Sequence, residues 1–168
     1  MAIMDIRQAL DFLKKHQPMP GDEPAEGFLL DTYKEVMDFF LINQNEECVP
    51  LFLNSFGSYD GFGVYQLVGD VITKYPSDIV VPALIDAITN GADPVKSWCA
   101  EIAYYFPDDR LIDCLGMLTS HENLDIRWPA ILALSKIDSN RIMELFGGLL
   151  LTERDQMAID EMKAYIKQ

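Results

Sequence analysis

Apolar residues recur along the chain at the spacing of an α-helix. One segment places them at positions i, i+4, i+7, i+8 and i+11, namely Leu29, Tyr33, Val36, Met37 and Phe40. Such spacing gathers apolar side chains on one helical face, and no sustained β-type alternation occurs anywhere. Short breakers rich in Gly, Pro, Asp and Asn separate segments of roughly 11 to 15 residues. The pattern predicts an all-α fold made of helical hairpins.

The hydrophobic pattern repeats every 31 residues. One column of the repeat is apolar in five successive copies: Tyr33, Val64, Val95, Ile126 and Met157. A constant period of this kind is the signature of stacked structural repeats. The predicted second helices of five hairpins are residues 31–44, 62–75, 93–106, 124–137 and 155–168. The predicted first helices are residues 3–16, 47–56, 78–90, 109–120 and 140–151.

The boundaries of the repeats divide one domain, residues 1–168, into five units. These units are approximately 1–45, 46–76, 77–107, 108–138 and 139–168. Ser77, Asp108 and Ser139 precede predicted first helices and are residue types that favour the N-cap position. An acidic, proline-bearing linker, 17–26, separates the helices of the first unit, and we expect it to be exposed and mobile.

Two of the second helices resemble the second helix of HEAT-like repeats, commonly written D-x-V-R-x-x-A-A-x-A-L-G-x-I. The first match comprises Asp93, Val95, Lys96, Cys99, Ala100, Ile102, Ala103 and Phe106. The second comprises Ile126, Arg127, Ala130, Ile131, Ala133, Leu134 and Ile137. Because the HEAT period is about 40–47 residues, this shorter unit is more similar to HEAT-like repeats of the phycobilisome-lyase type. The resemblance implies a right-handed α-solenoid whose second helices line one face, usually the concave one.

The chain is strongly acidic, with a net charge of −14. Between residues 17 and 73 lie ten acidic residues and a single basic residue, Lys34, which gives that segment −9 of the total. Such a charge repels phosphate backbones and anionic lipid head groups, so neither nucleic acid nor a membrane surface is expected as a partner. No uncharged apolar run approaches the roughly 20 residues of a membrane span. We expect a cytoplasmic protein without a targeting segment.

Candidate catalytic residues are scarce. His16 and His121 are the two histidines of the chain, and neither has partners at the spacing of a catalytic triad or a metal site. Cys48, Cys99 and Cys114 are widely spaced and form no CxxC pattern, which indicates reduced thiols. We therefore expect a non-enzymatic protein with no catalytic residue, no metal site and no cofactor.

The outward positions of the second helices carry aromatic and acidic residues. Trp98, Glu101 and Tyr105 follow at i, i+3 and i+7 and share one helical stripe. Similar positions in the neighbouring copies extend this stripe to a candidate partner-binding set: Tyr65, Asp70, Trp98, Glu101, Tyr105, Trp128 and, from the acidic half, Asp60. Two interpretations stay open at this point. The aromatics either pack between repeats as core residues or form a binding patch in which Trp and Tyr supply contact area and the acids attract the partner.

The second interpretation predicts a protein-binding module for a basic partner. HEAT-like repeats occur among immunity proteins of polymorphic and contact-dependent toxin systems, so the resemblance implies an immunity protein or antitoxin that neutralises a basic, nuclease-type toxin. We expect the free protein to be a monomer or a weak oligomer. The alternatives are a HEAT-like scaffold or assembly factor and a HEAT-like lyase. Fold alone does not choose among them.

Overall fold

The protein is all-α over the part of the chain that the computed structural model describes, residues 4–21 and 27–167. Those residues form ten α-helices and one short 3₁₀ helix, and they contain no strand. The elements are α1 (Ile6–Lys15), α2 (Gly27–Ile42), α3 (Cys48–Leu53), α4 (Gln66–Ile72), α5 (Ser77–Asn90), α6 (Asp93–Ala103), η2 (Asp109–Leu111), α7 (Ile112–Leu118), α8 (Leu124–Leu134), α9 (Asn140–Leu149) and α10 (Gln156–Ile166). None of the described helices combines the length and apolar character needed to cross a bilayer.

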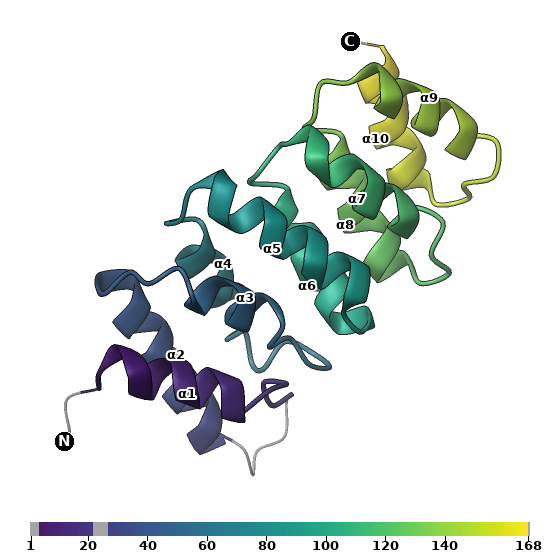
Figure 1. Cartoon of the computed structure of the whole chain (residues 1–168). Coiled ribbons are helices and arrows are strands. Elements are labelled where there is room, and N and C mark those ends of the chain that lie inside the picture. The colour runs from purple at the N-terminus through teal and green to yellow at the C-terminus, as the bar shows by residue number, and fades with distance from the viewer. Residues whose placement is uncertain (1–3, 22–26, 168) are drawn as a thin grey trace.

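The helices follow one another in chain order between termini that lie at opposite ends of the molecule (Figure 1). Consecutive helices pair, as α5 does with α6 and α7 with α8. Odd-numbered helices also contact odd-numbered ones from α1 to α7, and α2 contacts α4, α6 contacts α8 and α8 contacts α10. The chain therefore builds two layers, and the even-numbered helices are the predicted second helices.

Local sequence signals explain several helix starts. Asp5 and Gln8 form a reciprocal capping box at the start of α1, where Gln8 N donates to Asp5 Oδ1 over 2.8 Å and Asp5 N donates to Gln8 Oε1 over 3.0 Å. Asp108 caps η2 as predicted, because its carboxylate accepts from the Arg110 backbone N. Ser139 occupies the N-cap of α9 without a side-chain bond. The prediction for Ser77 is wrong, since it is the first residue of α5 and the extended Pro76 precedes it.

The predicted core column is buried in four of its five copies. Tyr33, Val64, Val95 and Ile126 are each at most 5% exposed, whereas Met157 is 62% exposed. In α10 the buried positions are Met162, which keeps the column of Ala100 and Ile131, and Ala158, which occupies the column of Lys96 and Arg127. The two segments that resemble HEAT-like repeats keep all their apolar template positions buried.

Part of the linker predicted to be exposed is anchored in the core, so that prediction is wrong for Met19 and Pro20. Both are buried, and Met19 N donates to the Ser55 carbonyl oxygen over 2.6 Å. The hydroxyl of Tyr65 donates to the carbonyl oxygens of Met19 (2.7 Å) and Pro20 (3.0 Å). The central part of the predicted linker, 22–26, lies outside the described residues.

All three cysteines are free and buried. Burial raises the pKa of Cys48 and of Cys114 to about 11, and it raises the pKa of Cys99 further. Thiols with such pKa values are protonated at neutral pH and react slowly.

A thiol titration checks this. At pH 8, where a pKa near 11 leaves on the order of one thiolate in a thousand, the native protein should give almost no colour with Ellman's reagent within minutes. In denaturant all three thiols should react. A cysteine that reacts at once in the native protein would contradict the buried positions of these side chains.

Candidate partner-binding groove

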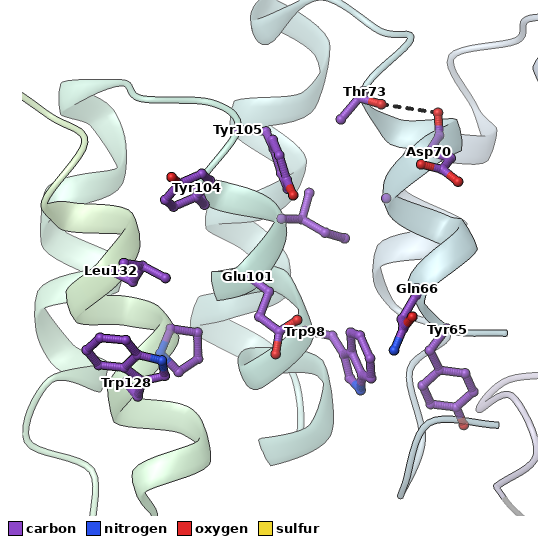
Figure 2. Close-up of a pocket in the computed structure, with 13 residues that line it drawn as sticks. Tyr65, Gln66, Asp70, Thr73, Trp98, Glu101, Tyr104, Tyr105, Trp128 and Leu132 are labelled. Carbon is purple, nitrogen blue, oxygen red and sulfur yellow. Dashed lines mark hydrogen bonds between the residues drawn. The ribbon is translucent and has the colours of Figure 1, made fainter. Parts of the chain in front are cut away.

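A groove crosses the even-numbered layer over α4, α6 and α8 and encloses about 840 Å³. Figure 2 shows its lining side chains projecting from these three neighbouring helices. The lining residues are Tyr65, Gln66, Gly69, Asp70, Thr73, Trp98, Glu101, Ile102, Tyr104, Tyr105, Trp128, Pro129 and Leu132. Six of the seven predicted site residues are therefore brought together in one place.

Helical periodicity explains why these residues share the groove. On α4 the lining positions Gln66, Gly69, Asp70 and Thr73 fall at i, i+3, i+4 and i+7, while Val68, Val71 and Ile72 on the other side are buried. Positions on α6 and α8 follow the same spacing. Because the even-numbered helices lie next to one another, their outward stripes merge into a single surface.

Trp98 serves both the core and the groove. Its indole stacks on Phe56, with ring centroids 5.5 Å apart and an interplanar angle of 13°, and meets the edge of Tyr65 at 5.7 Å. The side chain is nevertheless half-buried and lines the groove. The core interpretation therefore holds for the ring face that packs on Phe56, and the binding interpretation stays a prediction for the part that lines the groove.

Tyr65 is a core residue, contrary to the prediction that it points outward. It is 0% exposed, and its hydroxyl donates to Met19 and Pro20 and accepts a hydrogen bond from Gly57 N over 3.2 Å. The reason is helical spacing: Tyr65 has helical backbone angles and lies at i, i+3 and i+7 with Val68 and Ile72, on the buried side of α4. It contributes the supporting wall behind Trp98.

Asp60 lies outside the groove, in the turn that precedes α4. Its carboxylate accepts from Gly63 N over 3.2 Å, and the neighbouring Tyr59 and Phe62 have positive φ angles of 66° and 52°. A residue in such a turn orders the backbone through its own side chain. Asp60 is therefore accounted for by loop geometry.

The groove is acidic and lacks basic residues in its lining. Glu101 and Asp70 are its two carboxylates, and none of its lining residues is Lys, Arg or His. Figure 2 shows the carboxyl of Glu101 between the indole rings of Trp98 and Trp128. Although Glu101 is an exposed residue, partial burial of its carboxyl among these neighbours raises its pKa.

The groove's aromatic rim already holds one cation of the protein itself. Tyr104 and Tyr105 meet edge to face with centroids 5.4 Å apart, and Lys136 Nζ lies 4.8 Å from the centroid of the Tyr104 ring. This distance falls within the range of cation–π attraction. The face of the Tyr104 ring is therefore one that a positive charge can approach.

The predicted binding set omitted several lining residues, notably Thr73, Tyr104 and Leu132. Thr73 lies three positions after Asp70, and Leu132 lies four positions after Trp128. Extending each predicted stripe by one helical turn therefore includes them. Tyr104 is the C-cap residue of α6 with helical backbone angles, and it lies three positions after Glu101, so the same spacing finds it as well.

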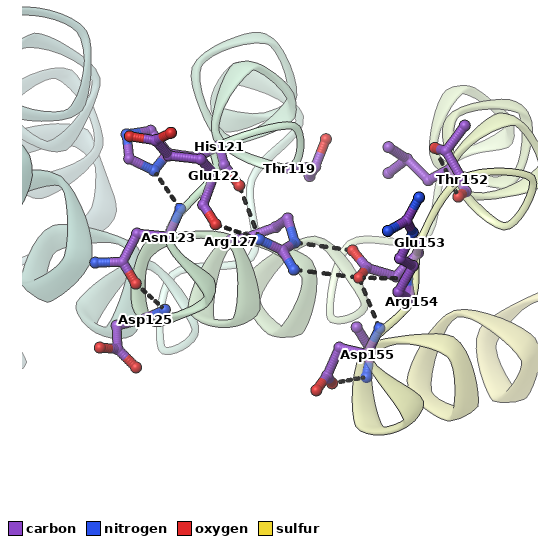
Figure 3. A network of polar contacts seen from close by, with 12 residues as sticks. Thr119, His121, Glu122, Asn123, Asp125, Arg127, Thr152, Glu153, Arg154 and Asp155 are labelled. Carbon is purple, nitrogen blue, oxygen red and sulfur yellow. Dashed lines mark hydrogen bonds and ion pairs between the residues drawn. The ribbon is translucent and has the colours of Figure 1, made fainter.

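A second polar cluster joins α8 to the loop before α10 (Figure 3). Arg127 donates from Nε to Glu153 Oε2 over 2.8 Å and from Nη2 to Oε1 over 3.2 Å. Arg127 Nη1 donates to the carbonyl oxygens of His121 and Glu122, and Glu153 also accepts from the backbone N of Arg154 and Asp155. The hydrogen bonds from Arg127, with smaller contributions from the backbone amides, hold the pKa of Glu153 at about 2. The charges of Arg127 and Glu153 are both used inside the protein, which indicates a structural link.

Comparisons of the chain with protein-family models, with curated proteins and with solved structures find no match. Over the described residues, no group of three or more His, Cys, Asp or Glu side chains is arranged to hold a metal ion.

Proposed function

We propose that this protein is a non-enzymatic protein-binding module whose groove over α4, α6 and α8 holds a basic segment of a partner. In this proposal the two helical layers are a right-handed α-solenoid of five short HEAT-like hairpins, and the groove lies on its concave face. One observation carries the function: aromatic side chains and two carboxylates gather on one hollow surface whose lining contains no basic residue. Trp and Tyr are the residue types that most often dominate the energy of protein interfaces.

The most concrete form of the proposal is a cytoplasmic immunity protein, or antitoxin, that blocks a nuclease-type toxin. A nuclease must hold phosphates, so its active site is basic and complementary to an acidic inhibitor. With a net charge of −14, the protein would attract such a partner over long range and associate at roughly 10⁸ to 10⁹ M⁻¹s⁻¹ at low salt. The strongly acidic segment between residues 17 and 73 would add to this attraction.

Affinity capture from a lysate, followed by identification of the partner and a binding measurement with the purified pair, tests the proposal. The partner should be basic, and its affinity should fall between about 50 mM and 500 mM salt because exposed charges are screened at the higher value. An acidic partner, or an affinity that salt leaves unchanged, would contradict it.

The groove variant best suited to this test is Tyr105→Ala with Glu101→Gln. Tyr105 is 64% exposed, so its removal leaves the core intact, whereas truncating Trp98 would also remove its stacking on Phe56. The double substitution should weaken partner binding at least about tenfold while the melting temperature stays near that of the original protein. A matched control is Phe28→Ala with Glu144→Gln, which changes an exposed aromatic and an exposed carboxylate outside the groove. Equal losses in both double variants would refute the groove as the binding surface.

A further inference from the structure

Glu101 has a carboxylate that no other side chain of the described protein neutralises. No described residue donates a hydrogen bond to it or forms an ion pair with it, in contrast to Asp108, Asp113 and Glu153, which all pair with arginines. A carboxylate that is partly removed from water and lacks a cation is electrostatically costly. A positive charge arriving from outside would remove that cost.

The surroundings of Glu101 favour one kind of cation. The carboxyl lies between two indoles, and Tyr104 and Tyr105 line the same groove farther along it. A guanidinium group is flat, stacks on aromatic rings, forms two parallel hydrogen bonds to a carboxylate and sheds water more readily than an ammonium group. An ammonium group is compact and strongly hydrated, so a crowded aromatic site suits it less well.

We propose that the groove receives an arginine side chain of the basic partner, with its guanidinium paired to Glu101 and stacked against Trp98 or Trp128. This inference rests on the proposed function and specifies the chemistry of the contact. A volume of about 840 Å³ lies within the range of sites that enclose whole small ligands, so one arginine fits together with its neighbours in the partner chain. Asp70, which lies on α4 next to α6, supplies a second carboxylate. It can pair with a further basic residue of the partner segment.

The two tryptophans of the chain both line the groove, so intrinsic fluorescence reports on this site. The probe is an acetylated and amidated peptide in which three arginines alternate with glycines. Matched peptides replace arginine by lysine or by citrulline, which has a similar shape and no charge. The arginine peptide should shift or quench the emission in a saturable way, and the lysine peptide should bind several-fold more weakly. The citrulline peptide should cause no saturable change.

Glu101→Gln should raise the dissociation constant of the arginine peptide at least about tenfold, whereas Glu144→Gln should leave it unchanged. Equal affinity for the arginine and lysine peptides, an unaffected Glu101→Gln variant, or no binding of the arginine peptide would each overturn the inference. If Tyr105→Ala still weakened partner binding after one of these results, the proposed function would remain supported and only the arginine contact would be excluded. If the original protein captured no partner at all, that result would instead contradict the proposed function.

Discussion

Replacing Glu153 by Gln should lower the free energy of unfolding by about 2–3 kcal/mol, which corresponds to a fall of about 5–10 °C in melting temperature for a chain of this size. The side chains of Glu153 and Arg127 are only 6% and 16% exposed. A glutamine keeps the shape of the side chain but removes the charge, so the guanidinium of Arg127 stays largely buried without a counter-ion. Removing one partner of such a pair costs more than the intact pair contributes.

The same pair predicts how stability depends on pH. The pKa of Glu153 is about 2 in the folded protein, against an ordinary value of 4.5, so the unfolded chain binds a proton more readily than the folded one. The stabilisation is therefore fully present above pH 4.5 and is lost progressively as the pH falls from 4.5 towards 2. Since one pKa unit corresponds to about 1.4 kcal/mol, up to about 3 kcal/mol is lost over this range.

Denaturant unfolding of the original protein and the variant at several pH values between 2 and 7 checks both effects. The two curves of stability against pH should converge near pH 2, because protonation removes from the original protein the charge that the variant already lacks. Glu144→Gln, which removes a carboxylate exposed on α9, is the control and should run parallel to the original protein. If Glu153→Gln also ran parallel over the whole range, the assigned pKa would be wrong.

The helices could be predicted because each carries a complete local signal. Apolar positions at helical spacing, the breakers between segments and the 31-residue period together placed every described α-helix and the caps at Asp108 and Ser139. The period failed at Met157, which is exposed, because α10 buries Ala158 and Met162 instead.

The groove could be predicted only in part. Trp98, Glu101 and Tyr105 were found because a helical stripe and a constant period together specify which outward residues of adjacent hairpins become neighbours. Asp60 was misplaced because its environment depends on a loop with positive φ angles, and the hydrogen-bond partners of Tyr65 lie far away in sequence. The Tyr65 hydroxyl donates to the carbonyl oxygen of Met19, 46 residues earlier. A 31-residue period does not predict a contact at that separation.

Several buried or half-buried tyrosines of this protein use their hydroxyl to fix a connecting segment. Tyr75 accepts from Asn45 N over 3.1 Å, and Tyr165 accepts from Ser139 N over 3.1 Å and donates to the carbonyl oxygen of Ile137 over 2.7 Å. Each hydroxyl reaches a loop that leads into the first helix of its own hairpin. Tyr65 follows the same principle at longer range, and it is the most completely buried example with three such bonds.

Replacing Tyr65 by Phe should therefore lower the free energy of unfolding by about 2–3 kcal/mol. The aromatic ring and its contacts with Phe56 and Trp98 remain, so the loss isolates the hydroxyl. Without it, the buried Gly57 amide loses its acceptor and the carbonyl oxygens of Met19 and Pro20 lose a donor. Water cannot easily enter in its place, because the approach is tight: a Cβ atom on Gly57 would lie 2.6 Å from the Met19 carbonyl oxygen.

Chemical denaturation of Tyr65→Phe measures the energy, and hydrogen exchange locates it. Protection should fall at Met19 N and Gly57 N, while the amides of α8 and α10 keep their exchange rates. Tyr59→Phe is the matched control, since Tyr59 is 75% exposed and lies in the same loop as Gly57. A loss below about 0.5 kcal/mol, comparable to that of an ordinary surface substitution, would show that the Tyr65 hydroxyl does not hold the segment around Met19 in place. The wall behind Trp98 would then depend on ring packing alone.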